Sequence, residues 1–144
     1  ILITKEGMSI KFKTNTINPI GRIAIGVKGI TLNDNDEVIA GLPIHKLSDE
    51  VAIFSESGLA KKVKIKDFPL QNRGGKGTIV YKTSSQTGKI IGATMVSDED
   101  NILLCGNKTN ICFSAKEIPS LSKVSAGNIM IKNNRVLSIT KIWD

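Results

Sequence analysis

The sequence predicts an all-β fold of three repeats of about fifty residues, each a propeller blade of four short strands. Apolar runs rich in β-branched residues alternate with turns of Gly, Asn and Asp, which is typical of short strands. No long stretch keeps the 3.6-residue period of a helix, so we expect no long helix. A four-strand pattern that recurs about every fifty residues is typical of propeller blades.

The first half of each repeat is predicted to be a β-hairpin, with an apolar run, a small polar turn and a second, partly apolar run. The three copies span residues 1–12, 52–63 and 103–113. The turn glycine Gly7 recurs as Gly58, about fifty residues on. In the third copy the turn falls on residues 107–110, where Asn tolerates left-handed backbone conformations nearly as well as Gly does.

The second half of each repeat adds two further strands. One strand lies in a segment with turn residues, at 21–32, 72–81 and 122–131, and an apolar strand then closes each unit, at 37–41, 89–93 and 135–139. We therefore expect one domain, 1–144, with blades at about 1–44, 45–97 and 98–144. Because a propeller typically needs about four to eight blades, three blades predict a partial ring: a fragment, a chain that pairs with another copy, or an open arc.

The composition indicates a globular, basic protein. Hydrophobic residues make up 40% and charged residues 23% of the chain, while aromatic residues, which grip single strands by stacking on bases, make up only 4%. The net charge of +7 favours a polyanionic partner over a protein that is only incidentally basic, because the charges are segregated. Residues 56–96 hold eight Lys or Arg and two acids, whereas acids gather in the expected turns 34–37, 49–50 and 98–100.

All three repeats resemble the repeats in the C-terminal domain of bacterial type IIA topoisomerase A subunits, and three segments of the first repeat carry this resemblance. They are Gly21 with Arg22, residues 26–32 and residues 35–38. Residues 71–77, which we call the box-like loop, resemble the gyrase A box: a Gln, basic residues, two glycines, a basic residue and a glycine. Asn72 departs from that pattern, because the family usually has a basic residue there. The box-like loop favours the A subunit of DNA gyrase over the corresponding subunit of topoisomerase IV.

The resemblance implies a β-pinwheel, a propeller-shaped ring whose blades exchange strands. It further implies a non-catalytic module that binds and wraps double-stranded DNA without sequence preference and supports ATP-dependent supercoiling by the parent topoisomerase. No cofactor is expected for this chain, whereas the parent enzyme would use ATP and Mg²⁺ in other domains or subunits. The implied partners are DNA, the remaining blades, the gyrase B subunit and the N-terminal domains of the A subunit. The implied location is the bacterial cytoplasm, in association with the nucleoid. Two alternatives are a propeller-like protein-interaction scaffold and the equivalent domain of topoisomerase IV.

Nine cations are the candidate DNA-binding residues, because phosphate recognition needs Lys and Arg repeated along a surface. They are Lys11, Lys13, Arg22, Lys28, Lys61, Lys62, Lys64, Arg73 and Lys76. Within the box-like loop (Gln71, Asn72, Arg73, Gly74, Gly75, Lys76 and Gly77), we expect the glycines to shape the loop. The first two units should carry most of the contact, since Cys112 and Ser114 replace lysines in the third.

No residue pattern predicts catalysis or a metal site. His45 has no recognisable nucleophile beside it, residues 98–100 are interpreted as a solvated acidic turn, and Cys105 and Cys112 lack metal-site spacing and are expected to be reduced core residues. The sequence around Lys76 lacks the spacing of a nucleotide-binding loop. Tyr81 is expected in the core, and Trp143 is expected to pack against a blade.

Overall fold

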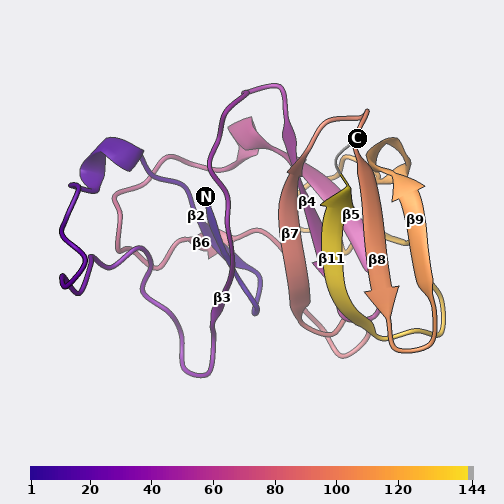
Figure 1. Cartoon of the computed structure of the whole chain (residues 1–144). Coiled ribbons are helices and arrows are strands. Elements are labelled where there is room, and N and C mark those ends of the chain that lie inside the picture. Colours follow the sequence, from indigo (N-terminus) through magenta and orange to yellow (C-terminus); the bar gives the residue numbers. More distant parts are fainter. Residues whose placement is uncertain (143–144) are drawn as a thin grey trace.

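The computed structural model describes residues 1–142, which form β-strands and short 3-10 turns arranged as three sheets side by side (Figure 1). Trp143, expected to pack against a blade, lies outside the described residues. The 3-10 turns are η1 (Thr14–Thr16), η2 (Ile65–Asp67) and η3 (Ala115–Glu117), and the described residues form no α-helix. The predicted all-β class with no long helix is therefore confirmed.

Each sheet is antiparallel and is centred on one of the predicted hairpins. The first has the order β3-β1-β2-β6, with strands Val38–Gly41, Leu2–Thr4, Met8–Ile10 and Thr78–Ile79. The second has the order β10-β5-β4-β7, with strands Asn128–Ile129, Leu59–Lys64, Glu50–Ser55 and Ile90–Val96. The third has the order β11-β8-β9, with strands Val136–Ile142, Asn101–Gly106 and Asn110–Ser114.

Neighbouring units exchange strands. Strand β6 belongs to the second unit but pairs with β2 of the first, with Ile79 opposite Met8. In the same way β10 of the third unit pairs with β5 of the second, with Ile129 opposite Leu59. The predicted four strands per unit are present in the second and third units. The first unit forms three, because residues 21–32 form no strand, which corrects the expectation of a strand there. Counted by sheet, the first two sheets have four strands and the described part of the third has three.

The hydrophobic core lies between the sheets, at what we call joints. Successive residues of a strand point to opposite faces, so β4 contributes to both joints. Val51 and Ile53 pack toward the first sheet, in a cluster that includes Ile3, whereas Phe54 packs toward the third sheet with Leu104. Because each core is shared by two sheets, neither sheet buries its apolar face alone.

Each joint is closed by an apolar residue that the next unit inserts. Phe68, which follows η2, is 1% exposed and lies in the first joint with Tyr81, confirming the expectation that Tyr81 is a core residue. Ile118 and Ile131 occupy the corresponding places in the second joint. The hydroxyl of Tyr81 donates to the carbonyl of Ala126, so a first-joint residue also contacts the third unit.

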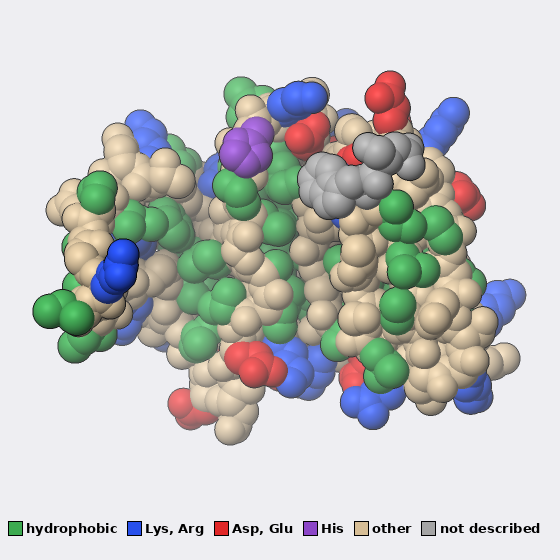
Figure 2. Space-filling model, viewed as in Figure 1, with side chains coloured by type: hydrophobic (Ala, Val, Ile, Leu, Met, Phe, Trp, Pro, Cys, Tyr) green, Lys and Arg blue, Asp and Glu red, His purple; other side chains and the backbone are tan. Residues whose placement is uncertain are grey.

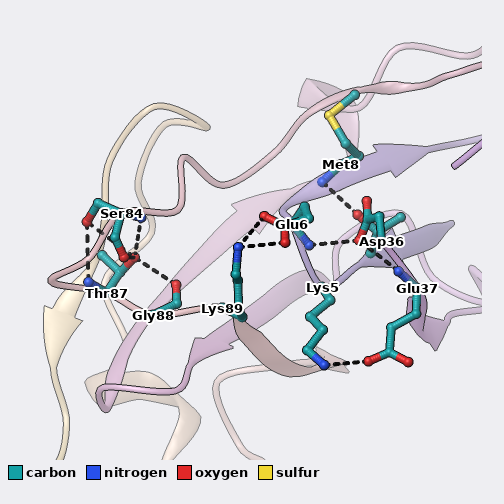
Figure 3. Close-up of polar contacts among 10 residues, drawn as sticks. Lys5, Glu6, Met8, Asp36, Glu37, Ser84, Thr87, Gly88 and Lys89 are labelled. Carbon is teal, nitrogen blue, oxygen red and sulfur yellow. Dashed lines mark hydrogen bonds and ion pairs between the residues drawn. The ribbon is translucent and has the colours of Figure 1, made fainter. Parts of the chain in front are cut away.

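The turn of the first hairpin is held by two ion pairs, one within the first unit and one to the second unit (Figure 3). The ammonium of Lys5 lies 2.5 Å from Glu37, and that of Lys89, in the second unit, lies 2.6 Å from Glu6. The carboxylate of Asp36 accepts the backbone N–H groups of Glu6 and Glu37. The cations at this end of the sheet are therefore already paired with carboxylates.

Candidate nucleic-acid interface

The strand pairing aligns the three units residue by residue. Ile3 pairs with Ser9 as Phe54 pairs with Ala60, each 51 residues further on. Cys105 pairs with Asn110, which are 51 and 50 residues further again because the third hairpin has a shorter turn. This alignment identifies which side chains occupy equivalent positions in successive blades.

A groove lies at each joint, where the second hairpin strand ends and the next unit arrives. The first, of about 550 Å³, is lined by Lys13, Thr16 and residues 70–72. The second has the same volume and is lined by the equivalent residues Lys64 and Ser120, by Lys66, and by the carboxylates of Asp49, Glu50 and Asp98. At each groove an isolated β-bridge joins the second hairpin strand to the next unit: Lys11 pairs with Leu70, and Lys62 pairs with Ser120. The repeat thus presents a lysine-bearing groove once per joint.

Three cations that line these grooves, and three others in the first two units, are exposed and have no hydrogen bond or ion pair from their side chains within residues 1–142. They are Lys13, Arg22, Lys28, Lys64, Lys66 and Lys76. Figure 2 shows Lys and Arg side chains spread over the face in view rather than gathered in one patch. A free ammonium or guanidinium can neutralise a phosphate without first breaking a contact within the protein.

The box-like loop is fixed against the first unit by its backbone. The N–H of Gln71 donates to the carbonyl of Lys11 at 2.8 Å, and that of Gly74 donates to Gly29 at 2.8 Å. The Nη1 atom of Arg73 donates to the Lys28 carbonyl at 2.7 Å. Arg73, predicted to contact DNA, therefore also positions the loop, while Lys76 of the same loop is left exposed.

Lys61, predicted to face DNA, lies instead in the protein interior. Its side chain is fully buried, and its ammonium donates to the carbonyls of Ser122, Lys123 and Ser125 at 2.7–3.0 Å. It also lies 4.8 Å from the centre of the Tyr81 ring, a cation–π contact. Burial lowers the pKa of Lys61 to about 8. All three N–H groups of its ammonium donate to carbonyls of the third unit. The prediction that Lys61 contacts DNA is therefore wrong.

The prediction that Lys62 contacts DNA is also wrong, because its side chain is buried at 5% exposure and is paired with two carboxylates. Its ammonium lies 2.6 Å from Asp98 and 3.5 Å from Glu50, and Ser120 donates a hydrogen bond to Glu50. Hydrogen bonding to Lys62 holds the pKa of Asp98 below its usual range. Lys11, the equivalent residue of the first unit, is half-buried and donates to the Ile65 carbonyl at 2.9 Å.

The third unit is weaker in cations, but one of its lysines matches a position that sequence reasoning did not single out. Ser114 stands where Lys13 and Lys64 stand in the other units. Lys116, however, is exposed and is the counterpart of Lys66, another residue missing from the predicted set. The 50-residue offset between the second and third units is the signal that would have found both.

The other residues that the sequence offered for catalysis or metal binding do not come together in the fold. His45 is exposed ahead of β4, Asp98 is engaged by Lys62, and Asp100 lies 2.9 Å from Lys141. Across residues 1–142 no three His, Cys, Asp or Glu side chains are grouped as metal ligands would be. Cys105 is half-buried and Cys112 is exposed, so Cys112 is not the core residue that its apolar surroundings predicted. No helix among the described residues has the length and apolar character needed to cross a membrane.

The fold and the site define a class of repeat proteins: propeller-type blades that exchange strands and carry exposed cations at their joints. A family model described as "DNA gyrase C-terminal domain, beta-propeller" matches residues 1–45 and 49–97. The chain therefore belongs to the family of DNA gyrase A C-terminal domains, and its repeats are β-pinwheel blades.

Similar proteins agree with this assignment. The DNA gyrase A subunit of Lawsonia intracellularis is 39% identical over 136 residues, which cover 92% of this chain and 16% of that protein. The crystal structure of the C-terminal domain of DNA topoisomerase IV matches 98% of this chain and 45% of its own length, with a TM-score of 0.92 and 25% identity. A DNA gyrase A C-terminal domain matches 99% of this chain and 50% of its own length, with a TM-score of 0.88; at 23% identity it supports the fold alone.

Proposed function

We propose that this chain binds double-stranded DNA without sequence preference, as a non-catalytic part of the C-terminal domain of a gyrase A subunit. The observation that carries the proposal is the recurrence of exposed lysines at equivalent joints: Lys13 at the first groove, and Lys64 and Lys66 at the second. Lysines that meet phosphates release counterions from the duplex, and this release drives binding independently of base sequence. Family membership supports DNA as the polyanion.

The repeated arrangement also supports bending. A stiff duplex resists bending, so many modest contacts along a curved surface must offset the cost of deforming it. Successive joints supply such contacts one unit apart, and the box-like loop, whose Gln71 and Asn72 line the first groove, adds the exposed Lys76. In the parent enzyme, a bend of this kind would support ATP-dependent supercoiling, with ATP and Mg²⁺ held in other domains or in the B subunit.

The test measures duplex affinity by fluorescence anisotropy over a range of salt concentrations. Replacing Lys13 and Lys64 together by Gln removes two phosphate contacts, which should reduce the slope of log affinity against log salt by about 1.8, at about 0.9 per contact. Lys108→Gln is the matched control. It removes an exposed lysine at the β8–β9 turn, at the opposite end of the hairpin from the position of Lys13 and Lys64.

An unchanged slope in the Lys13 and Lys64 double variant, or an equal loss in Lys108→Gln, would exclude the joint grooves as the DNA site. Bending is tested separately by sealing nicked circular plasmid in the presence of the chain. A salt-sensitive shift in linking number supports chiral bending. Binding with no shift would mean that these blades hold DNA without wrapping it.

A further inference from the structure

A loop of the third unit wraps around buried polar groups of the second unit. The ammonium of Lys61 donates to three carbonyls of this loop at 2.7–3.0 Å, those of Ser122, Lys123 and Ser125. The hydroxyl of Tyr81, whose ring lies beside that ammonium, donates to the carbonyl of Ala126. Residues 122–126, which we call the cage loop, therefore turn these carbonyls inward, toward the second unit.

An ammonium is not needed at this position to complete a joint. Ile10 occupies the position equivalent to Lys61 in the first unit and is 1% exposed. It lies against the box-like loop, the counterpart of the cage loop, because a Cβ at Gly75 would lie 3.8 Å from its Cδ1 atom. An apolar side chain therefore suffices for packing, whereas a buried ammonium costs free energy unless its donors are satisfied. What Lys61 adds to the second joint is its hold on the cage loop.

The inward carbonyls leave N–H groups of the cage loop pointing outward. In a trans peptide unit the C=O of one residue and the N–H of the next point in opposite directions, and the described chain has no cis peptide bond. The peptide units whose carbonyls Lys61 binds therefore direct three N–H groups outward, those of Lys123, Val124 and Ala126. Within residues 1–142 none of these three donates a hydrogen bond. Val124, between the other two, is 79% exposed.

The surroundings of these N–H groups favour an anion. Neighbouring backbone N–H groups that point out of a turn form a concavity that binds phosphate oxygens. The side chain of Lys123 is half-buried and forms no hydrogen bond or ion pair within the described residues. Lys61 places a second positive charge behind the loop. Residues 118–142 contain no Asp or Glu, in contrast to the second groove with its three carboxylates.

We propose that the cage loop binds a phosphate group through its outward N–H groups and Lys123, with Lys61 as the residue that positions the loop. The phosphate belongs to the DNA backbone, so this inference rests on the proposed function and extends it to the third unit. Backbone N–H groups are frequent partners of DNA phosphates and carry no sequence preference. The third unit, in which Ser114 stands where the other units have a groove lysine, thereby has a DNA contact of its own.

Amide chemical shifts test the proposal, because an N–H proton that donates to a phosphate oxygen moves downfield. The isotope-labelled chain is titrated with a short DNA duplex and, separately, with inorganic phosphate. We expect the N–H signals of Lys123, Val124 and Ala126 to move downfield to saturation in both titrations. The N–H of Lys108, which already donates to Asn134 at the β8–β9 turn, is the internal control and should not move with inorganic phosphate.

Two variants of one strand separate the cage loop from the grooves. Lys61→Met removes the ammonium, and the downfield shifts should be lost with either probe while fluorescence anisotropy still shows duplex binding through the grooves. Lys64→Gln, on the exposed side of β5, should weaken duplex binding and leave the shifts caused by inorganic phosphate unchanged. Tyr81→Phe removes only the hydroxyl and serves if Lys61→Met does not fold; it should reduce the shift of the Ala126 signal.

The salt dependence of duplex binding tests the side chain of the site. Lys123→Gln should reduce the slope of log affinity against log salt by about 0.9, the value for one phosphate contact. An unchanged slope in this variant would remove Lys123 from the site.

The outcomes distinguish this inference from the proposed function. Duplex binding without a shift of the three signals would overturn the inference and leave the proposed function intact. Shifts with inorganic phosphate but not with the duplex would show a site for a small anion and overturn its assignment to DNA. Unchanged shifts in Lys61→Met would overturn the positioning role of Lys61. Failure of the duplex to bind at all would overturn the proposed function, and with it DNA as the source of the phosphate.

Discussion

Among single residues, three lysines of one strand have three different environments. In β5, Lys61 is enclosed by carbonyls of the third unit, Lys62 forms a buried ion pair, and Lys64 is exposed. Because successive side chains of a strand point to opposite faces, Lys61 points away from Lys62. The groups that bind these two lysines come from segments distant in sequence. Asp98 and the carbonyl of Ser122 reach β5 only because the third unit packs against the second. A cation's role here is therefore set by the neighbouring blade.

The buried ammonium of Lys61 should make stability depend on pH. Its pKa is about 8 in the folded chain against 10.5 when exposed, so between these values the unfolded chain binds more protons. Above pH 10.5 Lys61 is neutral in both states and its burial carries no charge penalty, so its contribution to the free energy of unfolding is at its most favourable. That contribution decreases below pH 10.5 and is lost as the pH falls through 8. Urea unfolding should therefore show stability rising with pH from about 8 to 10, by at most about 1.4 kcal/mol per pH unit.

The Lys61→Met variant isolates this effect, since it removes the titrating group and should flatten the rise. Lys64→Met, on the exposed side of the same strand, should keep the wild-type slope. The comparison stays below pH 10 because burial raises the pKa of Tyr81, which opposes the trend at higher pH. Equal slopes in wild type and Lys61→Met would show that the lysine is not responsible.

Among the elements, the exchanged strands β6 and β10 are only two residues long and depend on their flanks. Gly77 precedes β6 with a φ of +75°, and a Cβ there would lie 2.2 Å from the carbonyl oxygen of Ser9. A residue with a side chain would both strain the backbone and push β6 away from β2. The short strand is therefore positioned by the close approach of two backbones, as well as by the buried Tyr81 that follows it.

Alanine substitutions at three glycines separate backbone strain from collision. Gly77→Ala should cost the most, more than about 1 kcal/mol, because it combines a positive φ with a clash. Gly26→Ala has the same kind of φ in open space and should cost about 1 kcal/mol. Gly21→Ala has open space and no positive φ, so it should be neutral. Urea midpoints rank the three, and an equal cost for all of them would contradict this account.

For the molecule as a whole, the position of the cores between sheets predicts that the blades unfold together. The first joint combines Ile3 of the first sheet, Val63 of the second and Phe68, which follows η2. A change at Phe68 should therefore loosen both sheets, although Phe68 belongs to the second unit. This coupling is typical of repeat proteins, in which stability depends on the interfaces between neighbours.

Phe68→Ala should cost about 3–5 kcal/mol, because it leaves a cavity at a side chain that is 1% exposed. Hydrogen exchange should show β1 and β5 losing protection by the same factor. Phe68→Leu, which keeps most of the volume, should cost about 1.5 kcal/mol or less and serves if the alanine variant is too unstable to purify. Loss of protection confined to β5 would mean that the blades are stabilised independently.

The amino-acid sequence was enough to predict the all-β class, the repeat of about fifty residues and the hairpin at the start of each unit. These features are local: strand-forming runs, turn residues and their spacing are visible without knowing which segments meet. The sequence also located Lys13, Lys64 and Lys76, which the fold leaves exposed.

The folded chain was needed to establish the exchange of β6 and β10 and the burial of Lys61 and Lys62. Strand exchange requires knowing which edge a two-residue strand meets, and its partner lies about seventy residues away in sequence, as for Ile79 and Met8. Burial of a lysine depends on carbonyls and carboxylates supplied by another unit. Repetition predicts the parts of each blade, whereas contacts between blades decide which charges remain free for a partner.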